Sequence, residues 1–346
     1  MSVAYDFSGV YNSLSDDAVR ALDALGINSA DANSLSKLSF EGVMGQLLKM
    51  TGESFSHPMK GLVTIIAVLI LCAMLSAYKS SLSGDISETV QTAASLCLSC
   101  AAAAPAVSFI CSAGNVITHC ANLFLAYIPL ASVMMAASGK AFGSVAYKGG
   151  MIAAGQGVAR ISSDVIVPLM NIFLGVAVTS GITPEARLKG FLSLVTKITK
   201  WMLAFAMTVF TAVLSMRQAA SGALDSLASR TARFALSSFV PMVGGALSEA
   251  YKSVQGSLHV LKSGLGIFVI LALAITFLPV VLQGIGWSLC ILVGKSFAEV
   301  MGIDGCAALL DALGMVFSAL IAVLLCVMAV FIISTAAAFT IGGEGA

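Results

Sequence analysis

Long apolar segments without charge alternate with short polar segments along this chain, and they predict helices that cross a membrane. Three intervals contain no Asp, Glu, Lys or Arg: residues 89–139, 263–294 and 312–343. A membrane-spanning helix needs about 20 apolar residues. The first interval therefore holds two spans, with a break near Gly114 and Asn115, and each of the others holds one. Shorter apolar segments add three candidates: Gly61–Tyr78, Val165–Ser180 and Trp201–Met216.

The first 57 residues differ from the rest because acidic residues outnumber basic ones there and no apolar run is long enough to span a membrane. Ser15 is placed to cap one helix that Gly26 ends, and Ser39 is placed to cap a second that Gly52 ends. Neither helix is long enough to form a core of its own. We therefore predict a short, acidic, soluble and helical N-terminal segment over residues 1–57.

The remainder, residues 58–342, is predicted to be an all-α, polytopic integral membrane helical bundle with six to eight spans. The count depends on 234–250, which is mostly apolar but contains Pro241, Gly244 and Gly245. In a helix interior proline costs about 3 kcal/mol and glycine about 1 kcal/mol. We therefore expect these residues to interrupt a helix inside the membrane, so that the segment either crosses or turns back. The Lys and Arg residues of the loops favour neither orientation.

Four prolines in similar apolar surroundings indicate an internal repeat. They are Pro129, Pro168, Pro241 and Pro279, and the second pair follows the first at a nearly constant offset. We interpret 122–216 and 234–335 as two repeats. Three crossings in each would make the repeats inverted, as in many secondary transporters, whereas two would make them parallel. Each proline is expected to break the helical hydrogen-bond ladder, which creates either a polar interior or packed kinks.

Composition supports the membrane assignment and excludes several functions. Hydrophobic residues make up 58% of the chain and charged residues 10%, whereas soluble domains carry about 25% charge. A formal net charge of +1 gives no basic footprint for nucleic acid. Because the chain contains no phosphate-binding P-loop, no HExxH motif and no GxSxG motif, we expect neither enzymatic activity nor a cofactor.

The eight cysteines do not indicate a metal or redox site. Cys97 and Cys100 form a CxxC pair, but the pair lies within an apolar helical stretch rather than on the turns that build zinc sites. We interpret these residues as small apolar packing residues.

Polar residues inside the first apolar interval are the leading functional candidates. Asn115, His119 and Asn122 are spaced i, i+4 and i+7, so they share one helical face. A lipid-facing polar stripe is costly. The stripe therefore either lines a path or binds an ion, or it makes hydrogen bonds between helices.

A second candidate group precedes the Val165 span. Arg160 and Asp164 are four residues apart and can pair along one helical face, with Gln156 one turn earlier. They form either a gating or relay pair or a charge pair at the headgroup boundary.

Three apolar segments together resemble one known family. They are Arg233–Ala250, Val165–Phe173 and Tyr127–Ala131, and their order and spacing are similar to those of the stage III sporulation protein AE family of endospore-forming bacteria. The resemblance extends over about Pro58 to Gly342, which is most of the chain. The family offers no catalytic residues to carry over.

The resemblance implies a polytopic protein of the mother-cell membrane that surrounds the engulfed forespore. There it would work with the other stage III sporulation proteins, including an ATPase and ring-forming proteins, and with a forespore-side partner. Together these form a channel-like, or feeding-tube, apparatus for forespore development.

Two function classes follow. One is a structural or conducting membrane subunit of that apparatus, and the other is a self-sufficient secondary transporter with inverted repeats. A transporter concentrates ionisable residues at mid-membrane. Only Arg160 and Asp164 come close to that pattern, so the subunit is the favoured interpretation.

Overall fold

The protein is a bundle of long helices. The computed structural model describes residues 14, 16–24, 40–77, 84–137, 141–182, 190–201, 204, 205, 208, 212, 215, 216 and 244–343. The regular elements within them are α2 (Asp16–Ala24), α4 (Phe40–Ala77), α5 (Gly84–Ala137), α6 (Ala141–Ile161), the π-helical turn η2 (Ser162–Ile166), α7 (Val167–Ile182), α9 (Gly244–Val300) and α10 (Asp304–Gly343). The predicted all-α fold is confirmed.

Four of the described helices are long and apolar enough to cross a membrane. Their candidate spans are Lys49–Met74, Ser95–Ala137, Leu265–Val300 and Asp304–Ala336. A shorter apolar helix covers Asp164–Thr179. The polytopic membrane bundle expected from the sequence is therefore confirmed in kind, while the predicted range of six to eight spans stays a prediction.

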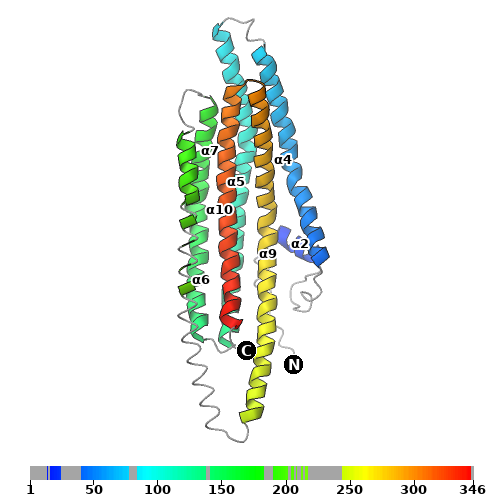
Figure 1. The fold of residues 1–346 in the computed structure, drawn as a ribbon, viewed down its shortest axis with the longest axis vertical. Coiled ribbons are helices and arrows are strands. Elements are labelled where there is room, and N and C mark those ends of the chain that lie inside the picture. The colour runs from blue at the N-terminus through cyan, green and yellow to red at the C-terminus, as the bar shows by residue number, and fades with distance from the viewer. Residues whose placement is uncertain are drawn as a thin grey trace.

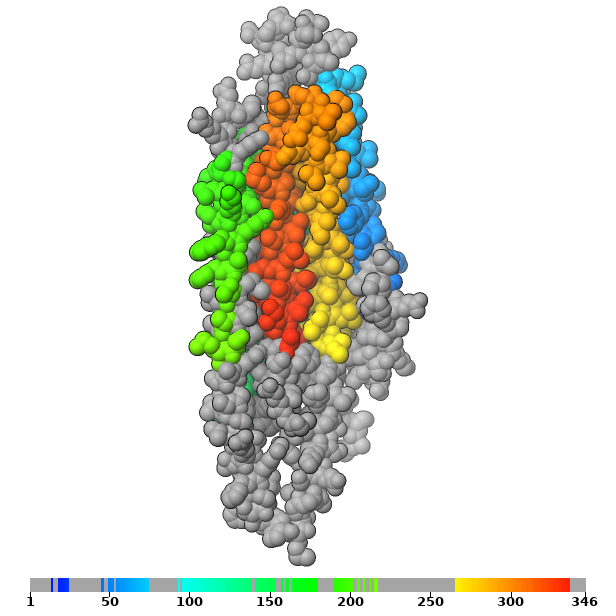
Figure 2. Space-filling model, viewed as in Figure 1, coloured from blue at the N-terminus to red at the C-terminus, as the bar shows by residue number. Residues whose placement is uncertain are grey.

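The helices lie nearly parallel to the long axis of the molecule (Figure 1). Helices α9 and α10 form an antiparallel hairpin, and the turn between them uses Gly302, whose φ of 69° suits a residue without a side chain. Helix α4 packs along α9, and α7 packs along α10. Helix α5 lies behind this layer and contacts α4, α6, α7, α9 and α10 (Figure 1). Figure 2, drawn from the same side as Figure 1, shows that α4, α9, α10 and the helical stretch 190–201 are exposed on this face.

Aromatic rings and glycines fill the centre of the bundle. The rings of Phe109 and Phe317 stack with centroids 5.1 Å apart, which joins α5 to α10. A Cβ added at Gly284 would lie 2.4 Å from Cζ of Phe109, and one at Gly61 would lie 2.1 Å from Cη2 of Trp287. Because lipid tails are as apolar as these side chains, close packing rather than the hydrophobic effect holds such helices together.

The predicted N-terminal helix is confirmed, since α2 begins directly after Ser15 and ends before Gly26. It packs against α9 and buries Ala18, Ala21 and Leu22. The N-terminal helix therefore joins the core of the bundle.

Several expected helix breaks are absent. Helix α5 runs without interruption through Gly114, Asn115 and Pro129, and α9 runs through Pro279. The second predicted N-terminal helix also does not end at Gly52, because α4 continues to Ala77. Proline removes only one hydrogen bond of the ladder, and neighbouring helices hold these segments straight enough to continue.

The other expected breaks have different outcomes. Pro168 is the second residue of α7 and lies two residues after the end of η2, where the α-helical ladder does change. Gly244 and Gly245 are the first residues of α9. Pro241 lies outside the described residues, so the interruption of a helix there stays a prediction.

Two helical hairpins occupy the regions that were interpreted as repeats. Helices α6, η2 and α7 run in the same direction as α9, and the stretch 190–201 runs in the same direction as α10 (Figure 1). The helices that carry Pro168 and Pro279 therefore run in the same direction, while the choice between parallel and inverted repeats stays a prediction. The repeat boundaries themselves, 122–216 and 234–335, fall partly outside the described residues and stay predictions.

Candidate functional site

Helix α5 presents its three candidate residues on one exposed face. Asn115, His119 and Asn122 are all exposed, and they lie around the middle of the candidate span Ser95–Ala137. Thr118 lies between them, and its hydroxyl donates to the carbonyl of Gly114 at 3.0 Å. Within the described part of the chain, the side chains of Asn115 and Asn122 make no hydrogen bond. Their polar groups are therefore exposed on the surface of the bundle, around the middle of this candidate span.

Helices α6 and α7 run antiparallel to α5. Near one end, the hydroxyl of Ser144 donates to the carbonyl of Ser132 at 2.7 Å. Towards the other end, a Cβ added at Gly114 would lie 2.8 Å from Cγ2 of Val167. Later residues of α6, η2 and α7 therefore contact earlier residues of α5, as expected for antiparallel helices.

These two contacts fix the depth of the second candidate group. Residues between 144 and 167 lie beside residues between 132 and 114. Arg160 and Asp164 lie between these two contacts along α6 and η2, and Asn115, His119 and Asn122 lie between them along α5, so the two groups occupy overlapping depths in the bundle. The structure thus brings together, in backbone depth, all six residues that were singled out separately.

The exposed polar residues also lie on the same side of the helix pair. At 3.6 residues per turn, Asn115, Thr118 and Asn122 are displaced about 40–100° around α5 from Gly114, the contact residue. Asn171, which is exposed, is displaced from Val167 in the same sense. In two antiparallel helices, a rotation of the same sign away from the contact residue leads to the same side of the helix pair. We use the name polar seam for the exposed polar residues of α5, α6, η2 and α7 at these depths: Asn115, Thr118, His119, Asn122, Arg160, Asp164 and Asn171.

The π-helical turn η2 lies within the seam. It covers Ser162–Ile166 and ends two residues before Pro168, which has no N–H to donate to the preceding turn. A π-turn changes the rotation of everything that follows it, and such turns occur frequently at functional sites. Here η2 sets the angle between Arg160 on α6 and Asn171 on α7.

The seam carries one cation and one anion, Arg160 and Asp164, and both side chains are exposed. Ionisable and amide groups that face hydrocarbon cost several kcal/mol. In a membrane this surface must therefore face water or protein rather than lipid. The arrangement offers hydrogen-bond donors and acceptors but no nucleophile held by a base.

The described residues contain no group of three or more metal-binding side chains. All eight cysteines are free thiols. Cys97 and Cys100 lie within α5, as expected, but both are exposed rather than packed in the core.

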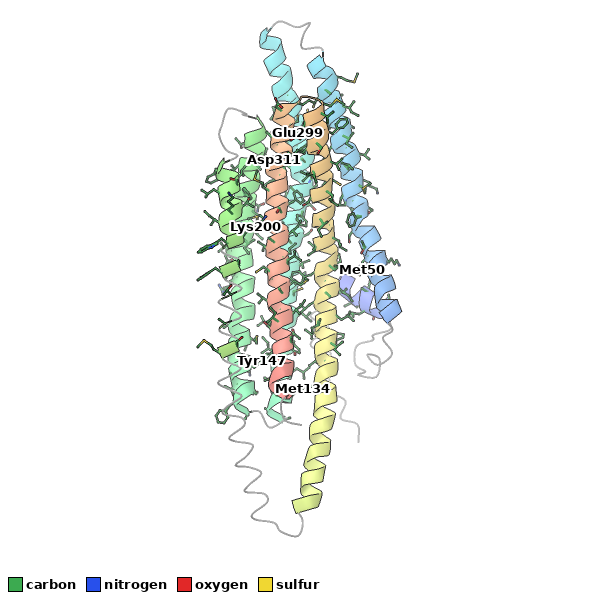
Figure 3. All side chains as sticks on the ribbon, viewed as in Figure 1. Met50, Met134, Tyr147, Lys200, Glu299 and Asp311 are labelled. Atoms are coloured by element: carbon green, nitrogen blue, oxygen red, sulfur yellow. The ribbon has the colours of Figure 1, made fainter. Side chains whose placement is uncertain are left out.

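Sequence reasoning missed two polar contacts between helices. Lys295 of α9 pairs with Asp311 of α10, with Nζ and Oδ1 2.5 Å apart, near the closed end of the hairpin (Figure 3). Lys200 donates to the hydroxyl of Ser318 of α10 at 3.0 Å. Asn171 was also missed, although its spacing of seven residues from Asp164 is a helical-face signal.

Comparison with known proteins gives one consistent family. The chain matches the sequence model of the family described as stage III sporulation protein AE over residues 29–342. It is 23% identical over 212 residues to stage III sporulation protein AE of Bacillus subtilis (strain 168), which covers 60% of this chain and 52% of that protein. The chain therefore spans about half the length of the curated relative it matches. No solved structure matches it.

Proposed function

Because this chain belongs to the stage III sporulation protein AE family, we propose that it is a membrane subunit of the intercellular channel apparatus that endospore development requires. In this role it lies in the mother-cell membrane around the forespore. It works there with ring-forming proteins, an ATPase and a forespore-side partner, and it acts as a structural or conducting component.

The polar seam is the observation that supports a role as a structural or conducting subunit, beyond membership of the family. Asn115, His119 and Asn122 lie around the middle of a candidate span and are exposed. A subunit that stands alone in lipid gains nothing from such a surface. A subunit that contributes one wall of a polar path, or that binds a neighbour in the membrane, requires one.

A self-sufficient secondary transporter is the weaker proposal. The transporter interpretation rested on inverted repeats, whereas the two hairpins run in the same direction (Figure 1). Within the seam the ionisable groups are His119, Arg160 and Asp164, which is few for a site that couples transport to an ion.

The test replaces Asn115 and Asn122 together with Leu in a sporulating cell. Leu inserts into a membrane more favourably than a polar residue, so the double variant should reach normal protein levels while forespore development falls. Thr64→Leu is the matched control, because Thr64 is an exposed polar residue on the face of α4. That variant should sporulate normally. Normal sporulation in the double variant would make the seam dispensable and leave the protein a scaffold.

A second experiment separates the two function classes. The full chain is purified from membranes of sporulating cells, and the proteins that accompany it are identified. A subunit travels with the ring-forming proteins and the ATPase. A self-sufficient transporter purifies without them, and that result would contradict the proposal.

A further inference from the structure

Two lysines lie at the contact between the helical stretch 190–201 and α10. The ammonium of Lys200 donates to the hydroxyl of Ser318 at 3.0 Å, and Lys197 lies one turn earlier on the same stretch. Both lysines are exposed. Neither forms a salt bridge with a carboxylate in the described part of the chain. Two neighbouring cations therefore lie on this surface without an anion to balance them.

The length of α10 gives the level of this contact in the membrane. Residues 312–343 carry no charge, and at 1.5 Å per residue they extend about 48 Å. The hydrocarbon core of a bilayer is about 30 Å thick, so a core centred on this stretch leaves about 9 Å at each end. Ser318 follows Ala312 by six residues, which is also about 9 Å. The bond between Lys200 and Ser318 therefore lies at the boundary between hydrocarbon and headgroups.

Helix α9 gives the same level independently. Its charge-free stretch is 263–294, and a hydrocarbon core of about 30 Å centred on that stretch ends near Ser288. A Cβ added at Gly284 would lie 3.0 Å from Cγ1 of Ile321 of α10. Because the two helices are antiparallel, the turn of α9 after Gly284 lies beside the turn of α10 that contains Ser318. Both helices therefore place the lysines at the edge of the hydrocarbon core.

Large apolar rings continue this surface toward the membrane interior. Trp201 is 69% exposed and stacks on Phe205, which is 59% exposed, with ring centroids 5.8 Å apart. Because the stretch 190–201 runs in the same direction as α10, away from the closed end of the hairpin, Phe205 lies deeper than the lysines (Figure 1). Tryptophan is enriched where hydrocarbon meets headgroups. The surface thus combines cations at headgroup level with exposed rings beside the lipid tails.

We propose that Lys197 and Lys200 bind the phosphate of an anionic phospholipid whose acyl chains lie along Trp201 and Phe205. Basic sites between membrane helices bind anionic headgroups in this way. The lipid is favoured over a free phosphate ion because the site lies at the edge of the hydrocarbon core and continues into apolar rings. A hydrated ion gains nothing from those rings, whereas a phospholipid matches both parts of the surface.

Ser318 acts as a positioning residue in this site. A lysine ammonium has three N–H donors and no acceptor. Lys200 therefore keeps donors for a phosphate oxygen while it donates to Ser318. The bond holds one end of a long, flexible side chain at headgroup level, where the phosphate lies.

The two tryptophans of the chain provide the measurement. Trp201 is exposed, whereas Trp287 is only 6% exposed, so bromine atoms on lipid acyl chains quench mainly the fluorescence of Trp201. The full chain is reconstituted into phosphatidylcholine vesicles that contain a minor fraction of brominated phosphatidylglycerol or of brominated phosphatidylcholine. We expect stronger quenching by the anionic lipid at the same fraction. Equal quenching by the two lipids would overturn the proposal.

Substitution of the lysines tests the residues themselves. Lys197→Gln and Lys200→Gln should each lower the preference for the anionic lipid about fivefold, the factor expected for one lysine at the membrane surface. Lys200→Arg keeps the charge and should retain most of the preference. Ser318→Ala should lower it by a smaller factor, because Lys200 remains but is no longer held. A preference that survives both glutamine substitutions contradicts the proposal.

Lys60→Gln is the matched control. Lys60 is an exposed lysine of α4, and α9 and α10 separate α4 from the stretch 190–201 (Figure 2). This variant should keep the full preference for the anionic lipid. A loss as large as that of Lys200→Gln would show a general effect of net charge, and the site would be wrong.

A last arm distinguishes the lipid from a free ion. Inorganic phosphate, compared with chloride at the same ionic strength, should leave the quenching by brominated phosphatidylglycerol unchanged. Displacement by phosphate alone would assign the site to a phosphate ion and overturn the lipid proposal. The vesicles contain no other protein, so these outcomes are independent of the proposed function.

Discussion

Two sides of this bundle follow different rules. On one side, α4, α9 and α10 approach one another through glycines, such as Gly61 against Trp287, and expose large apolar side chains. On the other side, α5 and the α6–η2–α7 segment expose the polar seam, which on α6 and α7 lies among exposed apolar side chains such as Val145 and Ile172. Both sides belong to the same molecule and would meet the same lipid. A difference in surrounding lipid therefore does not explain why their exposed side chains differ.

On the packed side, the contacts of the helices are made by residues of the same molecule. The asparagines of the seam make no such contacts within the described residues. Glycine contacts and stacked aromatic rings satisfy α9 and α10 with partners from the same molecule. Asn115 and Asn122 lack such partners in the described part of the chain. Changes on the packed side should therefore alter stability, and changes on the seam should alter function or assembly.

The largest effect on stability is expected from Gly284→Ala. Its added Cβ would meet Cζ of Phe109 at 2.4 Å, and that ring cannot move easily because it is stacked on Phe317 and only 1% exposed. Overpacking of this kind costs about 1–3 kcal/mol. The free energy of unfolding, measured on the purified protein in detergent, should fall accordingly.

Gly175→Ala is the control for that change. Gly175 is an exposed helical residue of α7, and an added Cβ would meet nothing within 4 Å. Without a clash, alanine should stabilise the helix by up to about 1 kcal/mol. Equal effects of the two substitutions would mean that the α5–α9 contact is looser than the structure describes.

A smaller effect is expected from Asp311→Asn. The Lys295–Asp311 pair joins the two helices of the hairpin and is about one-third exposed, with side-chain exposures of 30% and 32%. Loss of the carboxylate should cost about 1 kcal/mol, near the upper limit for pairs that water reaches. The variant and the unchanged protein are compared by thermal unfolding at low and at high salt.

Glu299→Gln tests whether that loss is specific to the pair. Glu299 lies 3.9 Å from the same lysine, but its side chain is 56% exposed. We expect almost no change in the unfolding temperature. A loss as large as that of Asp311→Asn would indicate a general charge effect rather than a bond between α9 and α10.

Local signals explain how much of the fold the sequence could predict. The position of α2 could be predicted between Ser15 and Gly26, because the signals that begin and end a helix are local in sequence. The apolar spans follow from composition. The break expected near Gly114 was wrong because this glycine allows Val167 of α7 to approach, and such contacts depend on a distant segment.

Only parts of the candidate site could be predicted from the sequence. Helical spacing alone placed Asn115, His119 and Asn122 on one face, and that single face is present in the structure. The alignment with Arg160 and Asp164 depends on the antiparallel register of α5 and α6, which no local pattern encodes. Asn171 could have been found by extending the spacing of Asp164 across Pro168.

The smallest effect on stability is expected where the functional effect is largest. Asn115→Leu and Asn122→Leu remove side chains that make no hydrogen bond in the described part of the chain, so the monomer in detergent should unfold within about 0.5 kcal/mol of the original protein. The measurement uses the same unfolding assay as for Gly284→Ala. A loss of 1–3 kcal/mol, the range expected for overpacking, would mean that the amides stabilise the folded monomer itself. The contrast between the packed side and the seam would then be wrong, because both would be stabilised by contacts within one chain.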